Sequence, residues 1–304
     1  MYKDIEFLSQ NVILRGRLYL PKMASSKKHP AIIMAHGFTS TVNNMTADKY
    51  AERFREAGFA VVIYDHRNLG ISDGEPRQEI NFWEQSRGYI DALDFVTDQP
   101  EIDTSKIAVW GASMSAREAF LVGSIDNRVS AIITIIPALG DDLPTEDNDG
   151  ILYQFAKDTL LSENISALPQ TKTKQMAIVS YDQLNAPSRL KELTAYRWFI
   201  EYGGRFGSGW ENRVSHSNID MPENFHFGQC ATYIKAPILM IVAKNDEMEG
   251  ASPEVTKSIF KMIKQPKEWV DIEGGHFGLL YYPSHLFDKS SKAQINFLER
   301  QFNQ

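Results

Sequence analysis

Short apolar runs alternate along most of the chain with segments of helical periodicity. Six runs each have the length of one buried strand, at residues 31–37, 59–65, 106–113, 129–137, 237–243 and 267–273. A strand that is apolar along its whole length is buried on both faces, which is typical of a parallel sheet. Strands that alternate with helices indicate βαβ units. The pattern therefore predicts an α/β protein, with a mostly parallel sheet covered by helices on both faces.

Helices are expected wherever apolar residues recur three or four positions apart. This spacing is found at residues 50–57, 83–97, 114–124, 253–264 and 284–302. The first twenty residues instead alternate between apolar and polar side chains, which indicates a pair of strands with one polar face.

One long interval breaks this alternation. Residues 138–236 separate the fourth and fifth predicted strands, and a structureless loop of that length would be exceptional within a domain. The interval contains helix-like pieces at residues 152–160 and 190–202 and many aromatic residues. We expect a core formed by residues 1–137 and 237–304, and an inserted cap over the carboxyl ends of the strands. The aromatic residues fit either an apolar pocket or the cap's own core.

Composition excludes several classes of function. The net charge is −7, which argues against a nucleic-acid partner because phosphate binding needs a basic face. The N-terminus lacks a cationic segment followed by an apolar run, and no apolar run is long enough to span a bilayer. The single cysteine, Cys230, rules out an internal disulfide and fits a reducing compartment. We expect a cytoplasmic protein without membrane insertion and interpret Cys230 as a structural thiol. The oligomeric state stays open, and a homodimer is compatible with the sequence.

The third apolar run ends at Ser113 and leads directly into a predicted helix through the sequence GASMS. A nucleophilic serine on such a strand-to-helix turn has a strained backbone, which tolerates only small residues two positions away on either side. Gly111 and Ser115 are both small, although glycine is usual at the second position. The alternative is a serine that caps the helix N-terminus. The strand before it and the helix after it favour Ser113 as a nucleophile.

A nucleophilic serine needs a base, and the base needs a carboxylate that orients it. On a fold of this kind the chain order is serine, acid, histidine. Asp246 lies just past the fifth predicted strand, and His276 lies past the sixth on a loop that begins with two glycines. Both stand at the carboxyl edge of the sheet, where ligands bind in open α/β folds. We therefore expect Ser113, Asp246 and His276 to meet in space.

Other residues are alternatives for the same roles. Glu247 is the nearest alternative acid, and Asp141 and Asp142, after the preceding strand, are less favoured. Asp246 is preferred because its shorter side chain directly follows the strand. None of the other six histidines has both the chain order and the strand-end position of His276.

Acyl chemistry also requires backbone donors that point at the developing oxyanion. The N–H of Met114 directly follows the predicted nucleophile at a helix N-terminus, and the N–H of Phe38 follows the first buried strand. Gly37 allows the backbone to approach closely. We predict that Phe38 and Met114 form the oxyanion hole and that His36 is structural.

No motif indicates a cofactor or a metal. The glycine-rich residues 203–209 lack the lysine and the preceding strand of a phosphate-binding loop. The sequence has neither H-E-x-x-H nor paired cysteine and histidine spacing. We expect residues 203–209 to form a turn, and we expect neither cofactor nor metal.

Together these motifs resemble those of the α/β-hydrolase superfamily. They are HGFT at residues 36–39, DHRNLGISDG at 65–74, GASMS at 111–115, NDE at 245–247 and GGHF at 274–277. Asn68 replaces the first glycine of the family pattern D-x-R-G-x-G-x-S-x-G, so that loop is expected to differ locally. The resemblance implies the α/β-hydrolase fold and a cofactor-independent Ser-His-Asp mechanism. Within the superfamily the chain is similar to the dienelactone-hydrolase and peptidase S15-like branch, and to acyl and polyketide transferases and thioesterases.

The expected activity is hydrolysis of a small carboxylic ester or thioester that carries an apolar acyl or ring part. Acyl transfer to an alcohol or amine would use the same acyl-enzyme, and cleavage of an amide or an activated C–C bond would use the same triad. A binding protein without catalysis is disfavoured because every triad position is filled.

Overall fold

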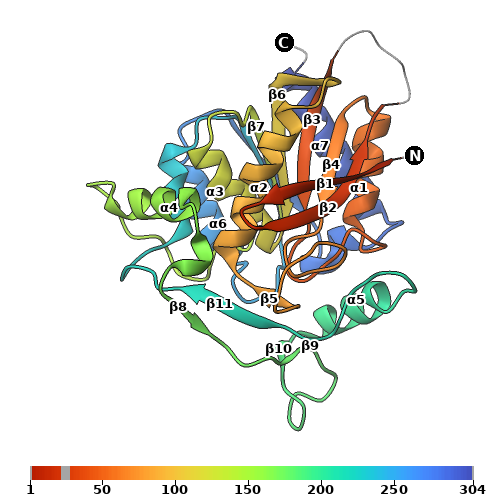
Figure 1. Ribbon diagram of the computed structural model, residues 1–304, viewed down its shortest axis with the longest axis vertical. Helices are drawn as coiled ribbons and strands as arrows, with labels where there is room; N and C mark the ends of the chain where they lie inside the picture. Colours follow the sequence, from red (N-terminus) through yellow and green to blue (C-terminus); the bar gives the residue numbers. More distant parts are fainter. Residues whose placement is uncertain (1, 22–27, 303–304) are drawn as a thin grey trace.

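A sheet of eight strands forms the centre of the molecule (Figure 1). The structure is a computed structural model that describes residues 2–21 and 28–302. The strand order is β1-β2-β4-β3-β6-β7-β12-β13. The strands are β1 (Lys3–Ser9), β2 (Val12–Tyr19), β3 (His29–Ala35), β4 (Ala60–Tyr64), β6 (Ile102–Ala112), β7 (Ala131–Ile135), β12 (Ile238–Ala243) and β13 (Lys267–Ile272). β1 and β2 pair antiparallel with each other, β2 pairs antiparallel with β4, and the remaining pairs are parallel. The predicted α/β class and mostly parallel sheet are confirmed.

Helices cover both faces of this sheet. One apolar core lies between the sheet and α2 (Phe82–Thr97), α3 (Met114–Ile125) and α6 (Pro253–Met262). The other lies between the sheet and α1 (Ala47–Glu56) and α7 (His285–Phe302). Successive strand residues point to opposite faces, so Ile33 enters the first core and its neighbour Ile32 the second. Because both faces of the sheet are covered, these strands are apolar along their buried length.

The predicted strands appear where the apolar runs lie, with one clear difference. β6 begins at Ile102, four residues before the predicted start. Ile102 is fully buried, but residues 103–106 are polar and at least partly exposed, so they separate it from the apolar run. Ile102 pairs with His29 of β3, and the register then shifts between His29 and Ala31. Pairing with a neighbouring strand therefore extends β6 beyond its buried part.

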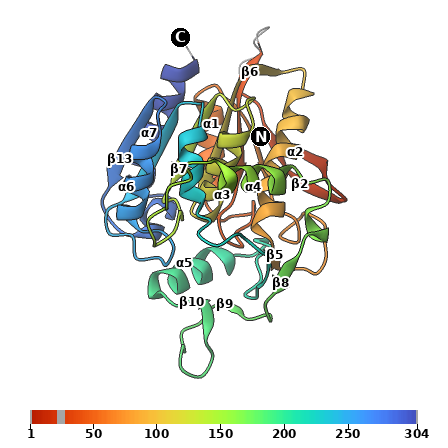
Figure 2. The ribbon, with the colours of Figure 1, turned by 90° about the vertical axis from the view of Figure 1, so that its left-hand side faces the viewer.

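Residues 138–236 have their own secondary structure, as their length required. α4 (Ile151–Leu161), η1 (Ile165–Ala167) and η2 (Phe227–Tyr233) lie beside α2 and α3 and contribute to the first core. α5 (Leu193–Gly203) and the short strands lie across one end of the sheet (Figures 1 and 2). These strands are β8 (Gln170–Lys172), β9 (Ala177–Val179), β10 (Ser188–Leu190) and β11 (Ser215–Ile219). Only part of the interval thus covers the sheet edge, and its division from the core as a cap domain stays a prediction.

A small second sheet ties this interval to the core. β11 pairs in parallel with β5 (Glu79–Ile80), which immediately precedes α2, and antiparallel with β8. β5 has only two residues and exists through pairing with a segment far along the chain. No local pattern in the sequence predicts it.

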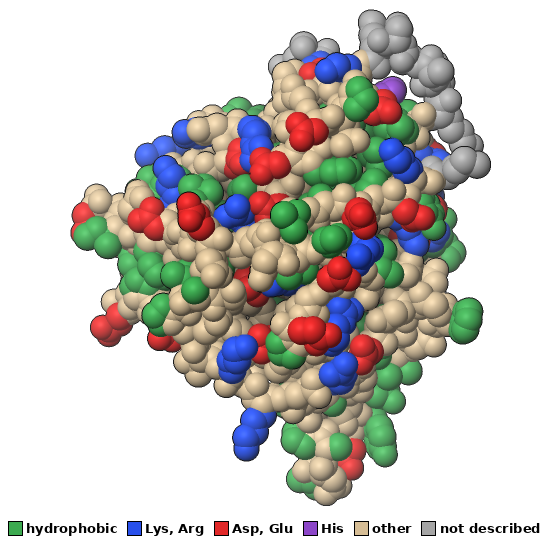
Figure 3. All heavy atoms as spheres, viewed as in Figure 1, with side chains coloured by type: hydrophobic (Ala, Val, Ile, Leu, Met, Phe, Trp, Pro, Cys, Tyr) green, Lys and Arg blue, Asp and Glu red, His purple; other side chains and the backbone are tan. Residues whose placement is uncertain are grey.

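The turn between β9 and β10 projects from the molecule beyond α5 and the short strands (Figure 1). It carries Tyr181 and Leu184, which are 83% and 89% exposed. Figure 3 shows apolar side chains on this projection, whereas acidic and basic side chains are interspersed over the rest of this face. The glycine-rich residues 203–209 begin at the last residue of α5 and continue as turns, as expected.

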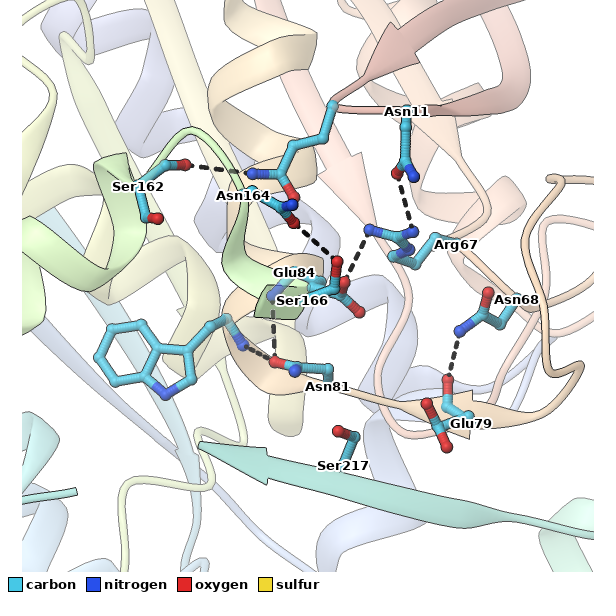
Figure 4. Close-up of polar contacts among 12 residues, drawn as sticks. Asn11, Arg67, Asn68, Glu79, Asn81, Glu84, Ser162, Asn164, Ser166 and Ser217 are labelled. Carbon is cyan, nitrogen blue, oxygen red and sulfur yellow. Dashed lines mark hydrogen bonds and ion pairs between the residues drawn. The ribbon is translucent and has the colours of Figure 1, made fainter. Parts of the chain in front are cut away.

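The start of α2 is fixed by a buried polar network (Figure 4). The Asn81 side chain accepts hydrogen bonds from the backbone N–H groups of Trp83 and Glu84, which caps the helix. The Glu84 carboxylate lies 2.8 Å from the guanidinium of Arg67, and these side chains are only 8% and 9% exposed. The loop after β4 is therefore joined to α2 by a buried ion pair.

Asn68 explains how the loop departs from the glycine of the family pattern. Its φ is +67°, a conformation that asparagine tolerates better than most residues. Its side-chain amide donates to the Glu79 carbonyl oxygen at 2.9 Å (Figure 4). Asparagine thus provides the left-handed backbone that glycine would provide and also connects the loop to β5.

Replacing Arg67 by methionine is expected to destabilise the protein by about 3–5 kcal/mol, because it leaves the Glu84 carboxylate buried without its cation. Urea denaturation measures this loss. Arg300→Met is the matched control, since its ion pair with Glu268 is 51% and 36% exposed; it should change stability by less than about 1 kcal/mol. Equal effects of both substitutions would contradict the assigned role of the buried pair.

Candidate active site

Ser113 lies on the turn between β6 and α3 with a strained backbone. Its φ is +58° and its ψ is −117°, a conformation that is uncommon outside glycine. Its N–H donates to the Ile135 carbonyl oxygen at 3.0 Å, and its own carbonyl accepts from the N–H groups of Ala116 and Ala138. Strain of this kind persists only where the surrounding structure enforces it, which is typical of functional sites.

Close backbone approach explains the small residues around Ser113. A Cβ at Gly111 would lie 2.1 Å from the Ser115 carbonyl oxygen, and a Cβ at Gly37 would lie 2.7 Å from the Ala112 carbonyl oxygen. Ser115 is fully buried. Its hydroxyl accepts from the Ala112 N–H at 2.9 Å and lies 3.0 Å from the carbonyl oxygens of both Ala35 and Ala112. The departure from glycine at this position therefore links the turn to the end of β3.

The structure brings the three predicted triad residues together. His276 Nε2 lies 2.9 Å from Ser113 Oγ, and His276 Nδ1 lies 2.9 and 2.8 Å from the two carboxylate oxygens of Asp246. The Asp246 and His276 side chains are only 1% and 3% exposed. Ser113 makes no capping hydrogen bond to α3. The geometry therefore matches a serine that faces a base rather than a helix cap.

Glu247, the alternative acid, contacts the backbone of His276 and not its ring. One carboxylate oxygen accepts from the His276 N–H at 2.9 Å, and the other accepts from the Thr194 hydroxyl on α5. A Cβ at Gly275 would lie 2.2 Å from the same carboxylate, so the glycine makes room for it. Asp141 accepts from the Gly250 N–H instead. Sequence reasoning missed this role of Glu247, because nothing in the local pattern relates it to α5.

Phe38 and Met114, the predicted oxyanion donors, both line the cavity that contains Ser113 and His276. Met114 is the first residue of α3, where backbone N–H groups have no acceptor within the helix and the helix dipole favours negative charge. The close approach at Gly37 brings the β3 loop against the Ser113 turn. The donor role of Phe38 and Met114 stays a prediction.

His36 is buried next to this site and is neutral. Burial is the main cause that lowers its pKa to about 3, and nearby His66 and Arg17 lower it further. Its carbonyl oxygen lies 3.2 Å from His66 Nε2. A histidine that stays uncharged and connects two loops fits the structural role expected for it.

The cavity has a volume of about 410 Å³ and is lined by both the core and residues 138–236. Trp198 and Phe199 of α5 face it, as do Phe38, Phe82 and Phe277. Trp198 and Phe199 also pack on Phe277. These aromatic residues therefore serve as the wall of a pocket and as part of the packing, so the two interpretations of the aromatic residues are not exclusive.

Two further observations concern groups outside the triad. Cys230 is buried in η2, and burial raises the pKa of its thiol to about 12, which leaves it unreactive at neutral pH. Within residues 2–21 and 28–302, no three His, Cys, Asp or Glu side chains cluster as a metal site would require. Across the same residues, no helix combines the length and apolar character needed to cross a membrane.

Comparison with known proteins identifies the family. Residues 10–277 match the model of the X-Pro dipeptidyl-peptidase (S15) family. The chain belongs to the S15 family. This confirms the predicted membership of the α/β-hydrolase superfamily and its S15-like branch.

The alignments with individual relatives cover nearly the whole chain. It is 40% identical to the thiohydrolase aneE of Aspergillus aculeatus, over 98% of the chain and 93% of that relative. It is 26% identical to the polyketide transferase grgF of a Penicillium species, over 98% and 96%. The crystal structure of the α/β hydrolase GrgF from Penicillium sp. sh18 aligns over the whole of both chains with a TM-score of 0.72 and 24% identity. The α/β-hydrolase fold is thereby confirmed, and the relatives support a hydrolase or acyltransferase.

Glu247→Ala should slow the reaction of Ser113 with a fluorophosphonate about ten- to a hundredfold, because the loop that carries His276 loses its backbone anchor. The rate at which the fluorophosphonate labels the protein measures this effect. Glu273→Ala is the matched control, because Glu273 is 68% exposed and forms an ion pair with Lys244, away from His276. Equal labelling rates for the two variants would show that Glu247 does not position His276.

Proposed function

We propose that the protein hydrolyses carboxylic esters or thioesters through an acyl-enzyme on Ser113. The observation that carries this proposal is the hydrogen-bonded chain from Ser113 Oγ to His276 to Asp246, with Nε2–Oγ at 2.9 Å. These distances lie within the range required of a nucleophile and its general base. The strained Ser113 turn adds support, because it holds the hydroxyl in the cavity.

Each step then follows from the position of a named group. His276 Nε2 takes the hydroxyl proton as Ser113 Oγ attacks the carbonyl carbon, and the carbonyl oxygen becomes an oxyanion. The N–H groups of Phe38 and Met114 stabilise that charge. The tetrahedral intermediate collapses and expels the alcohol or thiol, which takes the proton from His276. Water repeats the sequence on the acyl-enzyme, and this step releases the acid and regenerates Ser113.

Asp246 orients His276 and stabilises its protonated form. A carboxylate at Nδ1 fixes the tautomer in which Nε2 is free to accept a proton. The Asp246 side chain is almost fully buried, so its attraction to the imidazolium is weakly screened by water. Asp246 therefore acts through His276 and does not itself take up the proton.

The relatives favour thioesters within this class. The protein aneE is named a thiohydrolase, and its identity to this chain is 40% over almost the full length. The aromatic walls of the cavity fit an apolar acyl part. We infer a thioester with an apolar acyl chain as the preferred substrate class.

Ser113→Ala should abolish both labelling by a fluorophosphonate and turnover of short p-nitrophenyl esters and thioesters. His276→Ala should abolish turnover, and Asp246→Asn should lower kcat about ten thousandfold. The exposed Ser166 provides the control variant Ser166→Ala, which should behave like the wild type. Labelling that persists in Ser113→Ala would refute the proposal, and turnover by His276→Ala would refute the assignment of the base alone.

Acyl transfer is the second candidate, supported by the polyketide transferase name of grgF. The acyl-enzyme is the same, but an alcohol or amine replaces water in the second half. Mass spectrometry of products formed with candidate acceptors separates the two functions. Free acid as the only product at saturating acceptor would exclude transfer to the acceptors tested. An X-Pro p-nitroanilide tests amide cleavage in the same assay, and we expect no turnover of it.

A further inference from the structure

Arg117 places a cation inside the proposed active-site cavity. It follows Ser113 by one turn along α3, and its side chain lines the cavity. The guanidinium carbon lies 4.5 Å from the centre of the Phe82 ring and 4.9 Å from that of Phe227. The two aromatic rings hold the planar group by cation–π contacts. Its orientation is therefore fixed by packing.

Within residues 2–21 and 28–302, no side chain or backbone oxygen forms a hydrogen bond or a close ion pair with the guanidinium. The buried carboxylate of Glu118 attracts it only from beyond ion-pair distance. The Nε–H group of Arg117 is buried, and no described oxygen accepts a hydrogen bond from it. No carboxylate in that part of the chain forms an ion pair with the guanidinium. The neighbouring Glu118 lies 3.1 Å from His66 Nε2 instead. The cavity wall carries four acidic residues, Asp141, Asp142, Glu192 and Glu249, and none of them forms a close ion pair with Arg117. Asp141 accepts from the Gly250 N–H instead. Burial of a cation whose N–H groups have no acceptor is costly, and an anion bound from outside the chain would supply the missing acceptor.

A second unpartnered polar group faces the same region. His216 lines the cavity, and its buried Nε2 has no hydrogen-bond partner in the described part of the chain. Burial is the main cause that lowers its pKa to about 4, and Arg189 and Arg117 lower it further. The imidazole is therefore neutral at neutral pH and carries one N–H. Burial likewise lowers the pKa of Arg117 to about 10, so this side chain remains charged at neutral pH.

We propose that Arg117, with His216 as a second donor, binds a carboxylate on the acyl part of the substrate. A guanidinium offers two parallel N–H donors that match the two oxygens of a carboxylate. This inference rests on the proposed function, because it places the carboxylate relative to a carbonyl attacked by Ser113. The substrate class it names is the half-ester or half-thioester of a dicarboxylic acid.

Distance favours a carboxylate over a phosphate. Four residues of α-helix correspond to a rise of about 6 Å between the two Cα atoms, and both side chains line one cavity, so an anion at Arg117 is within reach of a short acyl chain held at Ser113. The phosphate of a pantetheine thioester lies at the far end of a long arm, on the side of the leaving group. A carboxylate at the end of a short acyl chain lies on the acyl side of the reacting carbonyl, and a short chain can span from Ser113 to Arg117.

The test uses two p-nitrophenyl esters with five-carbon acyl chains, the hydrogen glutarate and the pentanoate. Arg117→Met should lower kcat/KM for the glutarate about ten- to a hundredfold, mainly through KM, since it loses hydrogen bonds to a charged group. Its effect on the pentanoate should stay below about threefold. Arg117→Lys should recover part of the loss, because lysine keeps the charge but not the paired donors. His216→Phe should show a smaller loss that is likewise confined to the glutarate.

Arg205→Met is the matched control. The Arg205 guanidinium also lies over an aromatic ring, 3.9 Å from that of Tyr202, but the residue is outside the cavity. This variant should leave the preference between the two esters unchanged. An equal loss on both esters in Arg117→Met, or no loss on either, would overturn the carboxylate site.

Two further measurements separate the remaining outcomes. If Arg117→Met lowers kcat/KM for the coenzyme A thioester of pentanoate but not for the N-acetylcysteamine thioester, then Arg117 binds a phosphate, and the carboxylate proposal is wrong. If the wild type turns over neither ester, the proposed function fails. Calorimetric titration with glutarate then still tests the site, because binding should occur in the wild type and be at least tenfold weaker in Arg117→Met. Equal binding to both would overturn the inference independently of catalysis.

Discussion

The close approach of backbone segments around Ser113 is the constraint on which the rest of the site depends. Only hydrogen fits where Gly111 faces the Ser115 carbonyl and where Gly37 faces the Ala112 carbonyl. These contacts hold Ser113 at a positive φ and press the loop after β3 against the turn. Ser113, the start of α3 and residues of the neighbouring loop then line one cavity. A larger residue at either glycine would move all of these groups together, because the atoms it would meet are backbone atoms.

The sheet brings distant parts of the chain to this turn. β6, β7, β12 and β13 are parallel neighbours, so the loops that follow them leave from one edge. Asp246 and His276 follow β12 and β13 and therefore reach Ser113. The Thr194–Glu247–His276 contacts then join α5 to the loop that carries the histidine. Helix α5, which lines the cavity, and the loop that carries His276 are thus joined through one carboxylate.

Sequence patterns anticipated the elements whose signal is local. A strand buried on both faces is apolar throughout, so β3, β4, β7 and β12 were predictable within a few residues. Chain order and strand ends were sufficient to select Ser113, Asp246 and His276. The two-residue β5 was not predictable, because it exists only through pairing with β11. The same holds for the division of residues 138–236 between the side of the core and the sheet edge, which depends on packing against α2 and α3.

The sequence by itself determined the α/β class, the order of the strands along the chain and the residue types available for acyl chemistry. These follow from periodicity and spacing, which are properties of neighbouring residues. Only the tertiary structure decided that Asp246 contacts the His276 ring while Glu247 contacts its backbone, although the two acids are adjacent. It also decided that Arg117 lines the cavity without a carboxylate partner in the described part of the chain. The physical reason is that contacts and solvent exclusion arise between segments far apart in sequence, so they follow from the packing of the whole chain.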